Sequence, residues 1–180
     1  MNMKRKNKII ISICISALLV AIYLYYAKMP QVEDRGEWVM LQKSHKINGY
    51  LRVDDKIYGG DFGISDIKYA TPLKDVDPES FEVCKNSDYA RDKNHVYYPI
   101  WVKCYDGETW GICEYVEYIV KGASPKSFKY IGKEYGVDGY TMYYRGGKTK
   151  WNDSVIIHYL NHGQIKDTLC SLCRKRDKIY

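Results

Sequence analysis

The chain has 180 residues and a formal net charge of +6, but four of its 28 Lys and Arg residues stand within positions 4–8. The 24 basic side chains that remain face 22 acidic ones, so the rest of the protein is nearly neutral. We therefore expect no nucleic-acid partner, because such binding needs a basic face on the folded domain. A remainder of about 150 residues is the size of one ordinary domain.

The N-terminus predicts a membrane anchor. Residues 1–8 form a basic segment, and a run of nineteen uncharged, mostly apolar residues follows from Ile9 to Ala27. As a helix this run is roughly 28 Å long, close to the hydrocarbon thickness of a bilayer. The cations before it predict a cytoplasmic N-terminus. We expect residues 9–27 to be a transmembrane helix of a bacterial inner membrane, with the C-terminal domain in the periplasm or outside the cell.

A cleaved signal peptide is the alternative interpretation of the same segment. Signal peptides carry an apolar core of about 7 to 15 residues and small side chains at the cleavage site. Here the core is longer, and a cut after Ala27 would put Tyr25 where a small residue is needed. A lipoprotein signal at Cys14 is disfavoured by its isoleucine neighbours, Ile13 and Ile15. Under each interpretation the C-terminal domain is exported.

The composition after the anchor predicts a mainly β fold. We expect residues 28–48 to form a linker and the entry to a domain spanning 49–180. The chain has 19 Tyr, which favours the half-buried surface of a sheet, and 14 Gly, several of them paired with Asp or another Gly. Such pairs supply the positive φ of tight hairpin turns. The prediction is an antiparallel domain of sheets and hairpins.

Two segments of this domain repeat each other, and we place the repeat units at about 77–98 and 124–144. The shared positions are Pro78/Pro125, Ser80/Ser127, Phe81/Phe128, Tyr89/Tyr135, Asp92/Asp138, Val96/Met142, Tyr97/Tyr143 and Tyr98/Tyr144. A shortened third copy is suggested by Val53–Phe62. The segment 99–122 is then an insertion between the two longer units.

The first unit carries the segment YARDKNHVYY, from Tyr89 to Tyr98, directly after DPESF. This pattern resembles the repeat of the bacterial DKNYY family, over roughly 49–150 of the chain. In the second unit Gly139 and Tyr140 stand where the Lys and Asn would be, so the resemblance there rests on the Asp and the Tyr-Tyr pair. It implies an exported or envelope-associated protein of undefined activity and supplies no catalytic residues.

Each unit predicts strands around Phe81–Cys84 or Phe128–Ile131, around Tyr89–Arg91, and on the Tyr-Tyr pair. Asp92, Lys93 and Asn94 are expected to form a turn, because short polar side chains bond local backbone amides. The functional alternative is a ligand-binding loop. Tyr97 and Tyr98 point to opposite faces of a strand, so we expect one in the core and one on the surface. Exposed tyrosines of this kind would offer an aromatic stripe to a glycan or peptide.

The insertion predicts a disulfide-closed hairpin. Two strand-like segments flank an Asp-Gly turn, which brings Cys104 and Cys113 to facing positions. In an oxidising compartment these cysteines are expected to bond. The hairpin, with Trp110 near its tip, is the most exposed protrusion and a candidate contact surface.

The C-terminal tail holds the one arrangement with metal-like spacing, and its candidate zinc ligands are His158, His162, Cys170 and Cys173. Two His four residues apart share an ion on a helix, whereas the sequence around His158 is β-branched and predicts a strand. A structural disulfide between Cys170 and Cys173 is the favoured alternative, with a redox-active pair or two reduced thiols as others. Cys84 aligns with Ile131 of the second unit and is expected to be a free thiol in the core.

No catalytic group or cofactor motif emerges, so we expect no cofactor and a non-catalytic domain. The first hypothesis is a single-pass envelope protein that binds another protein or an envelope component. The second is an immunity-type inhibitor of a toxin that acts outside the inner membrane. The third is a hydrolase or thiol oxidoreductase with an unrecognised site.

Overall fold

The computed structural model describes residues 3–27, 32–105 and 112–150, and the chain divides into two compact units, Met1–Gln31 and Val32–Tyr180. The first unit is the helix α1, Met3–Ala27, whose side chains are described for residues 11–24. Over those residues the large apolar side chains are exposed. In the part of the chain that the structure describes, no helix has the length and apolar character needed to cross a membrane.

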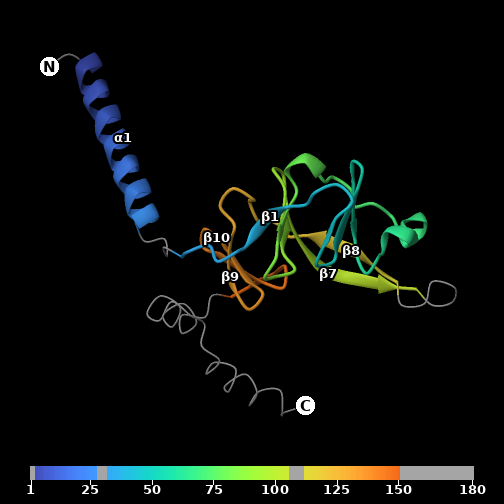
Figure 1. The fold of residues 1–180 in the computed structure, drawn as a ribbon. Coiled ribbons are helices and arrows are strands. Elements are labelled where there is room, and N and C mark those ends of the chain that lie inside the picture. The colour runs from blue at the N-terminus through green and yellow to red at the C-terminus, as the bar shows by residue number, and fades with distance from the viewer. Residues whose placement is uncertain (1–2, 28–31, 106–111, 151–180) are drawn as a thin grey trace, which may run out of the picture. The chain divides into compact units, whose positions relative to one another are not determined.

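The described part of the second unit is built almost entirely from antiparallel strands (Figure 1), which confirms the prediction of a mainly β, antiparallel domain. The strands are β1 (Trp38–Met40), β2 (Lys46–Ile47), β3 (Tyr50–Val53), β4 (Lys56–Gly59), β5 (Glu82–Cys84), β6 (Ala90–Arg91), β7 (Val96–Cys104), β8 (Cys113–Ile119), β9 (Lys129–Gly132), β10 (Tyr135–Asp138), β11 (Thr141–Tyr144) and β12 (Gly147–Thr149). Two 3₁₀ turns, η1 (Ile64–Tyr69) and η2 (Pro78–Ser80), lie between β4 and β5. The described strands form three sheets, in the orders β1-β5-β6-β7-β8, β12-β11-β10-β9 and β2-β3-β4.

One motif, a three-stranded meander, occurs three times along the chain. The strand triplets β2-β3-β4, β5-β6-β7 and β9-β10-β11 are each joined by short turns and paired with neighbours in sequence. In each, a tyrosine stands at the first residue of the middle strand or directly before it: Tyr50, Tyr89 and Tyr135. In each, the third strand carries a buried aliphatic–tyrosine pair: Ile57–Tyr58, Val96–Tyr97 and Met142–Tyr143. The segment suggested as a shortened third copy is thus part of the first meander.

The three meanders stack as layers, with β5-β6-β7 in the middle. One face of this middle layer packs against the first meander in a cluster that includes Tyr50, Phe81 and Tyr97. The other face packs against the third meander in a cluster that includes Tyr98, Phe128 and Tyr143. Because side chains alternate along a strand, successive residues of β7 enter different clusters. The central sheet is therefore buried on both faces.

Residues 28–48 were expected to be a linker and the entry to the domain, and they contribute β1 and β2 to the second unit. Strand β1 pairs with β5, with Val39 opposite Val83, and β2 pairs with β3. The Asp34 carboxylate accepts a hydrogen bond from the backbone N–H of Tyr130 at 3.1 Å, which ties this segment to the third meander. Strands of two or three residues carry too little alternation to be recognised in a sequence.

Candidate functional site

The carboxylate of Asp92, in the turn between β6 and β7, is only 3% exposed and is surrounded by donors. Its Oδ1 atom accepts hydrogen bonds from the backbone N–H groups of Asn94 and His95, both at 2.7 Å. Its Oδ2 atom accepts from the backbone N–H of Asp77 at 2.7 Å and from the Tyr97 hydroxyl at 2.8 Å. Each oxygen of this carboxylate already accepts two hydrogen bonds from the protein, so little acceptor capacity remains for a ligand.

Lys93 and Asn94 are exposed at the same turn, and Lys93 is tied to the 3₁₀ turn η2. The Lys93 ammonium forms an ion pair with Asp77 at 2.9 Å, and the backbone N–H of Lys93 donates a hydrogen bond to the Ser80 hydroxyl at 3.1 Å. The Ser80 hydroxyl and then Lys93 lower the pKa of Asp77 by hydrogen bonding to its carboxylate. These contacts therefore hold the turn at Asp92–Asn94 against the first residues of the same repeat unit, Asp77–Ser80.

In the second unit, the equivalent Asp makes the same kind of contact with fewer hydrogen bonds. Asp138 accepts a hydrogen bond from the backbone N–H of Ser124 at 2.7 Å and another from the Ser127 hydroxyl. Ser124 stands directly before Pro125, as Asp77 stands directly before Pro78. The repeated Asp thus secures the chain just ahead of the repeated Pro in both units.

The prediction that one of Tyr97 and Tyr98 lies on the surface is wrong. Their exposures are 0% and 5%, because the central layer is covered on both faces. The second unit behaves as expected, with Tyr143 buried and Tyr144 42% exposed, since the outer face of that sheet has no covering layer among the described residues. No aromatic stripe is therefore built from Tyr97 and Tyr98.

An open groove of about 840 Å³ lies at the base of the β7–β8 hairpin. All three meanders contribute to it through the turn that precedes their middle strand: Gly49, Asp88 and Glu134 each stand directly before the tyrosine of their unit. The DKN turn lies at the other end of that middle strand. Of the predicted binding candidates that the structure describes, only Tyr98 lines the groove.

The rest of the groove was missed from the sequence. Asp61 and Arg145 add charge to its walls, while Ile100, Val102 and Tyr115 add apolar surface from the hairpin. Each comes from a loop or an edge strand with no distinctive motif. The one usable signal was the repeat itself, because alignment on the tyrosines places Gly49, Asp88 and Glu134 at equivalent positions.

Two tyrosines of the groove are held in their neutral form. Burial, followed by the Glu134 carboxylate, raises the pKa of Tyr98, and burial, followed by Asp88 and Asp61, raises the pKa of Tyr115. Neither phenol is activated for proton transfer or nucleophilic attack. Among the described residues, no group of three or more His, Cys, Asp and Glu is placed to hold a metal ion. The groove presents apolar and charged side chains next to one another.

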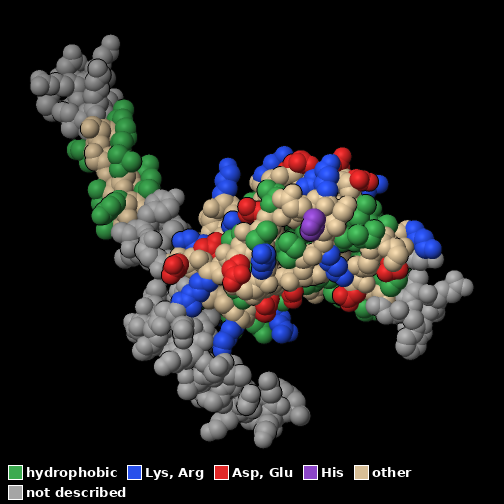
Figure 2. All heavy atoms as spheres, in the orientation of Figure 1, with side chains coloured by type: hydrophobic (Ala, Val, Ile, Leu, Met, Phe, Trp, Pro, Cys, Tyr) green, Lys and Arg blue, Asp and Glu red, His purple; other side chains and the backbone are tan. Residues whose placement is uncertain are grey.

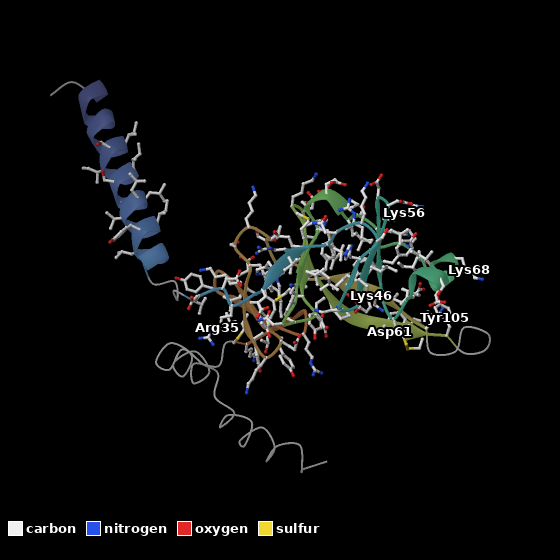
Figure 3. The ribbon with its side chains drawn as sticks, viewed as in Figure 1. Arg35, Lys46, Lys56, Asp61, Lys68 and Tyr105 are labelled. Atoms are coloured by element: carbon white, nitrogen blue, oxygen red, sulfur yellow. A yellow bond between two sulfur atoms is a disulfide. The ribbon has the colours of Figure 1, made fainter. Side chains whose placement is uncertain are left out.

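The predicted hairpin and its disulfide are confirmed. Cys104 and Cys113 face each other in register on β7 and β8 and are bonded. Figure 1 shows the two strands running side by side away from the layers, and Figure 3 labels Asp61 and Tyr105 beside them. The backbone N–H of Asp61 donates to the carbonyl of Cys113 at 2.9 Å, which fixes the hairpin to the first meander.

Of the residues still to be placed, Cys84 lies in the described part of the chain and the others do not. Cys84 is a buried free thiol, and burial raises its pKa to about 11. The candidates that lie outside the described residues are Trp110, His158, His162, Cys170 and Cys173.

Comparison with known proteins gives one match. A model of the DKNYY family matches residues 50–169, about two thirds of the chain, whereas no curated protein and no solved structure matches. The matched region opens at the first residue of β3 and takes in the middle layer, the hairpin and the third meander. The resemblance inferred from the repeated Asp and Tyr-Tyr frame is confirmed, and the chain belongs to the DKNYY family.

Proposed function

We propose that this chain is a membrane-anchored protein of the bacterial envelope whose exported, non-catalytic domain binds a protein partner through the β7–β8 hairpin. The proposal of an anchor and of export rests on the apolar run from Ile9 to Ala27 and on the four cations before it. The proposal of binding rests on the surface of the hairpin.

The observation that carries the proposal is the concentration of exposed apolar side chains on the hairpin. Ile100, Trp101, Val102 and Val116 are 36%, 56%, 38% and 42% exposed. Figure 2 shows acidic, basic and hydrophobic side chains mixed over the visible face of the domain, whereas these four exposed apolar side chains all belong to the two strands of one hairpin. Exposed apolar patches mark contact sites, and Trp is among the residues that dominate binding energy.

The hairpin is also held rigidly, which favours its use as a docking element. The Tyr115 ring covers Gly49 and Gly59, where a Cβ atom would come within 1.7 and 2.4 Å of it. The backbone N–H of Lys74 donates to the Tyr118 hydroxyl at 2.7 Å. A surface already fixed in its bound shape loses less conformational entropy on association.

The disulfide supports an exported location. Cys104–Cys113 links two exposed strands, and bonds of this kind persist in oxidising compartments such as the periplasm. The same cross-link restrains the end of the hairpin that lies furthest from the layers.

Site-specific photo-crosslinking in living cells tests the binding proposal. A photo-reactive amino acid replaces Trp101 in one strain and Ile64, which is 58% exposed on η1, in the control strain. We expect a discrete crosslinked partner from position 101 and none from position 64. The partner is then purified, and its affinity for the wild-type chain is compared with that for Trp101→Ser. Equal crosslinking at both positions, or equal affinity of the two chains, would overturn the proposal.

The location is tested separately with alkaline phosphatase, which is active only outside the cytosol, fused after Tyr180. Activity in whole cells is expected, and loss of that activity on replacing the four N-terminal cations is the second expected result. If the captured partner is a toxin that the chain neutralises, the immunity hypothesis is the specific form of the function.

A further inference from the structure

The groove at the base of the hairpin is continuous with the surface proposed above to bind a partner. Ile100 and Val102 belong to the hairpin and also line the groove, so a partner seated on the hairpin reaches into it. The inference that follows rests on the proposed function and concerns the chemistry of the segment that enters.

The charged wall of the groove is predominantly acidic. It carries three carboxylates, Asp61, Asp88 and Glu134, against one guanidinium, Arg145. Asp61 and Asp88 are exposed, and within the described residues neither takes part in an ion pair. Glu134 is half-buried and accepts a hydrogen bond from the Ser87 hydroxyl at 3.3 Å. The wall therefore holds negative charge that the domain itself does not balance.

The other wall is apolar and aromatic. Tyr98, Pro99, Ile100 and Val102 follow one another along β7, and Tyr115 lies across from Val102 on β8. Tyrosine and aliphatic faces accept both apolar side chains and the methylene stem of a lysine or arginine. One wall thus suits apolar groups and the other suits cations, along a groove open enough for an extended chain.

The shape of the groove is fixed by glycines where the units meet. Gly60 has a φ of +142°, and a Cβ atom there would lie 1.9 Å from the Cys113 carbonyl oxygen. Gly146 has a φ of +73°, and a Cβ atom there would lie 2.8 Å from Ile100. The first and third meanders approach the hairpin this closely only because both positions lack a side chain.

We propose that the groove binds an extended, basic segment of the protein partner, with lysine or arginine side chains against Asp88 and Glu134 and apolar side chains against Tyr98, Ile100 and Val102. The charge balance of the two walls selects a cationic and apolar segment over an acidic one. Electrostatic attraction of this kind raises the rate of association and discriminates against acidic segments.

Fluorescence anisotropy with the full chain in a non-ionic detergent tests this. The probe is a fluorescein-labelled peptide of four Lys-Val pairs, and its counterpart has four Glu-Val pairs. We expect the Lys-Val peptide to bind at least tenfold more tightly and to weaken as salt rises from 50 to 300 mM, since exposed charges are screened at about 10 Å or less. Equal binding of the two peptides would refute the inference.

Charge-neutralising variants locate the site. The double variant Asp88→Asn/Glu134→Gln keeps the size and the hydrogen-bonding oxygen of both side chains, and we expect it to lose affinity for the Lys-Val peptide by tenfold or more. The matched control is Asp55→Asn/Glu37→Gln, which removes the same charge from exposed positions outside both the groove and the hairpin and is expected to stay within twofold. An equal loss in both would mean that only net charge matters, which would contradict the inference.

Two further readouts separate the possible failures. If position 101 crosslinks a partner while the groove variants leave peptide affinity unchanged, the inference fails and the proposed function stands. If position 101 crosslinks nothing, the proposed function fails. A photo-reactive amino acid at position 100, which lines the groove, identifies the occupant in the intact chain. A crosslink to a separate protein is expected, whereas a crosslink to residues 172–180 of the same chain would overturn the assignment to a partner.

Discussion

Replacing Asp92 tests the idea that the DKN motif stabilises the fold. Asp92→Ala removes the acceptor for four hydrogen bonds, of which the one from the Tyr97 hydroxyl is buried and the other three are partly buried. A hydrogen bond to a charged group contributes about 1.5–3 kcal/mol, and the Asn94 and His95 amides at the turn regain part of theirs from water. We therefore expect Asp92→Ala to lower the free energy of unfolding by about 3–5 kcal/mol, a large share of the 5–15 kcal/mol typical of a domain.

The assay is chemical denaturation of the full chain in detergent, followed by tryptophan fluorescence. Asp55→Ala is the control, because Asp55 also lies in a two-residue hairpin turn but its side chain is 78% exposed, and we expect a change within about 0.5 kcal/mol. In a Tyr97→Phe background the cost of Asp92→Ala should fall by about 1–2 kcal/mol, since one donor is already gone. A loss for Asp92→Ala no larger than that of the control would refute the reasoning.

Three further outcomes are expected. Ser80→Ala should raise the pKa of Asp77 toward its usual value in an NMR titration. A carboxylate whose pKa is lowered in the folded state contributes stability above about pH 4, and this contribution is lost as the pH falls. The variant should therefore lose this stability at a higher pH than the wild type. An unchanged titration would remove the hydroxyl as the main cause. Gly60→Ala should destabilise the domain by about 2–4 kcal/mol in thermal unfolding, while Gly147→Ala, with its nearest contact at 3.6 Å and no positive φ, should stay within about 0.5 kcal/mol. Cys84 should resist iodoacetamide at pH 8 in the native protein and react in urea, as read by mass spectrometry, because burial and a pKa of about 11 leave almost no thiolate; native labelling at that site would contradict its position in the core.

The features predicted correctly from the sequence are those that depend on neighbours in the chain. The strands around Val83, Ala90 and Tyr130 follow from alternation and from the repeat, and the observed strands lie within a residue or two of the expected segments. The pairing of Cys104 with Cys113 follows from a separation of only nine positions in the sequence. In each case, the information lies within one turn and its two strands.

The features that could not be predicted depend on how the units stack. Nothing in the sequence near Tyr98 distinguishes it from Tyr144, yet one is buried between two layers and the other is 42% exposed. The difference arises because the middle meander has a partner on each face and the third meander is an outer layer. The groove was missed for the same reason, since Asp61 and Asp88 meet only after the units have packed.

The arrangement separates the family motif from the candidate binding surface within each meander. The Asp of the DKN turn is consumed by hydrogen bonds inside its own unit, so a change there acts on stability before it acts on any partner. By contrast, the Asp88 side chain, in the turn at the opposite end of the same strand, is exposed and takes part in no ion pair among the described residues. Because Asp88 and Glu134 both line the groove, different side chains at these two positions would alter its charge while the hydrogen bonds of Asp92 stay the same. A scaffold built in this way lets specificity change independently of the sequence pattern by which the family is recognised.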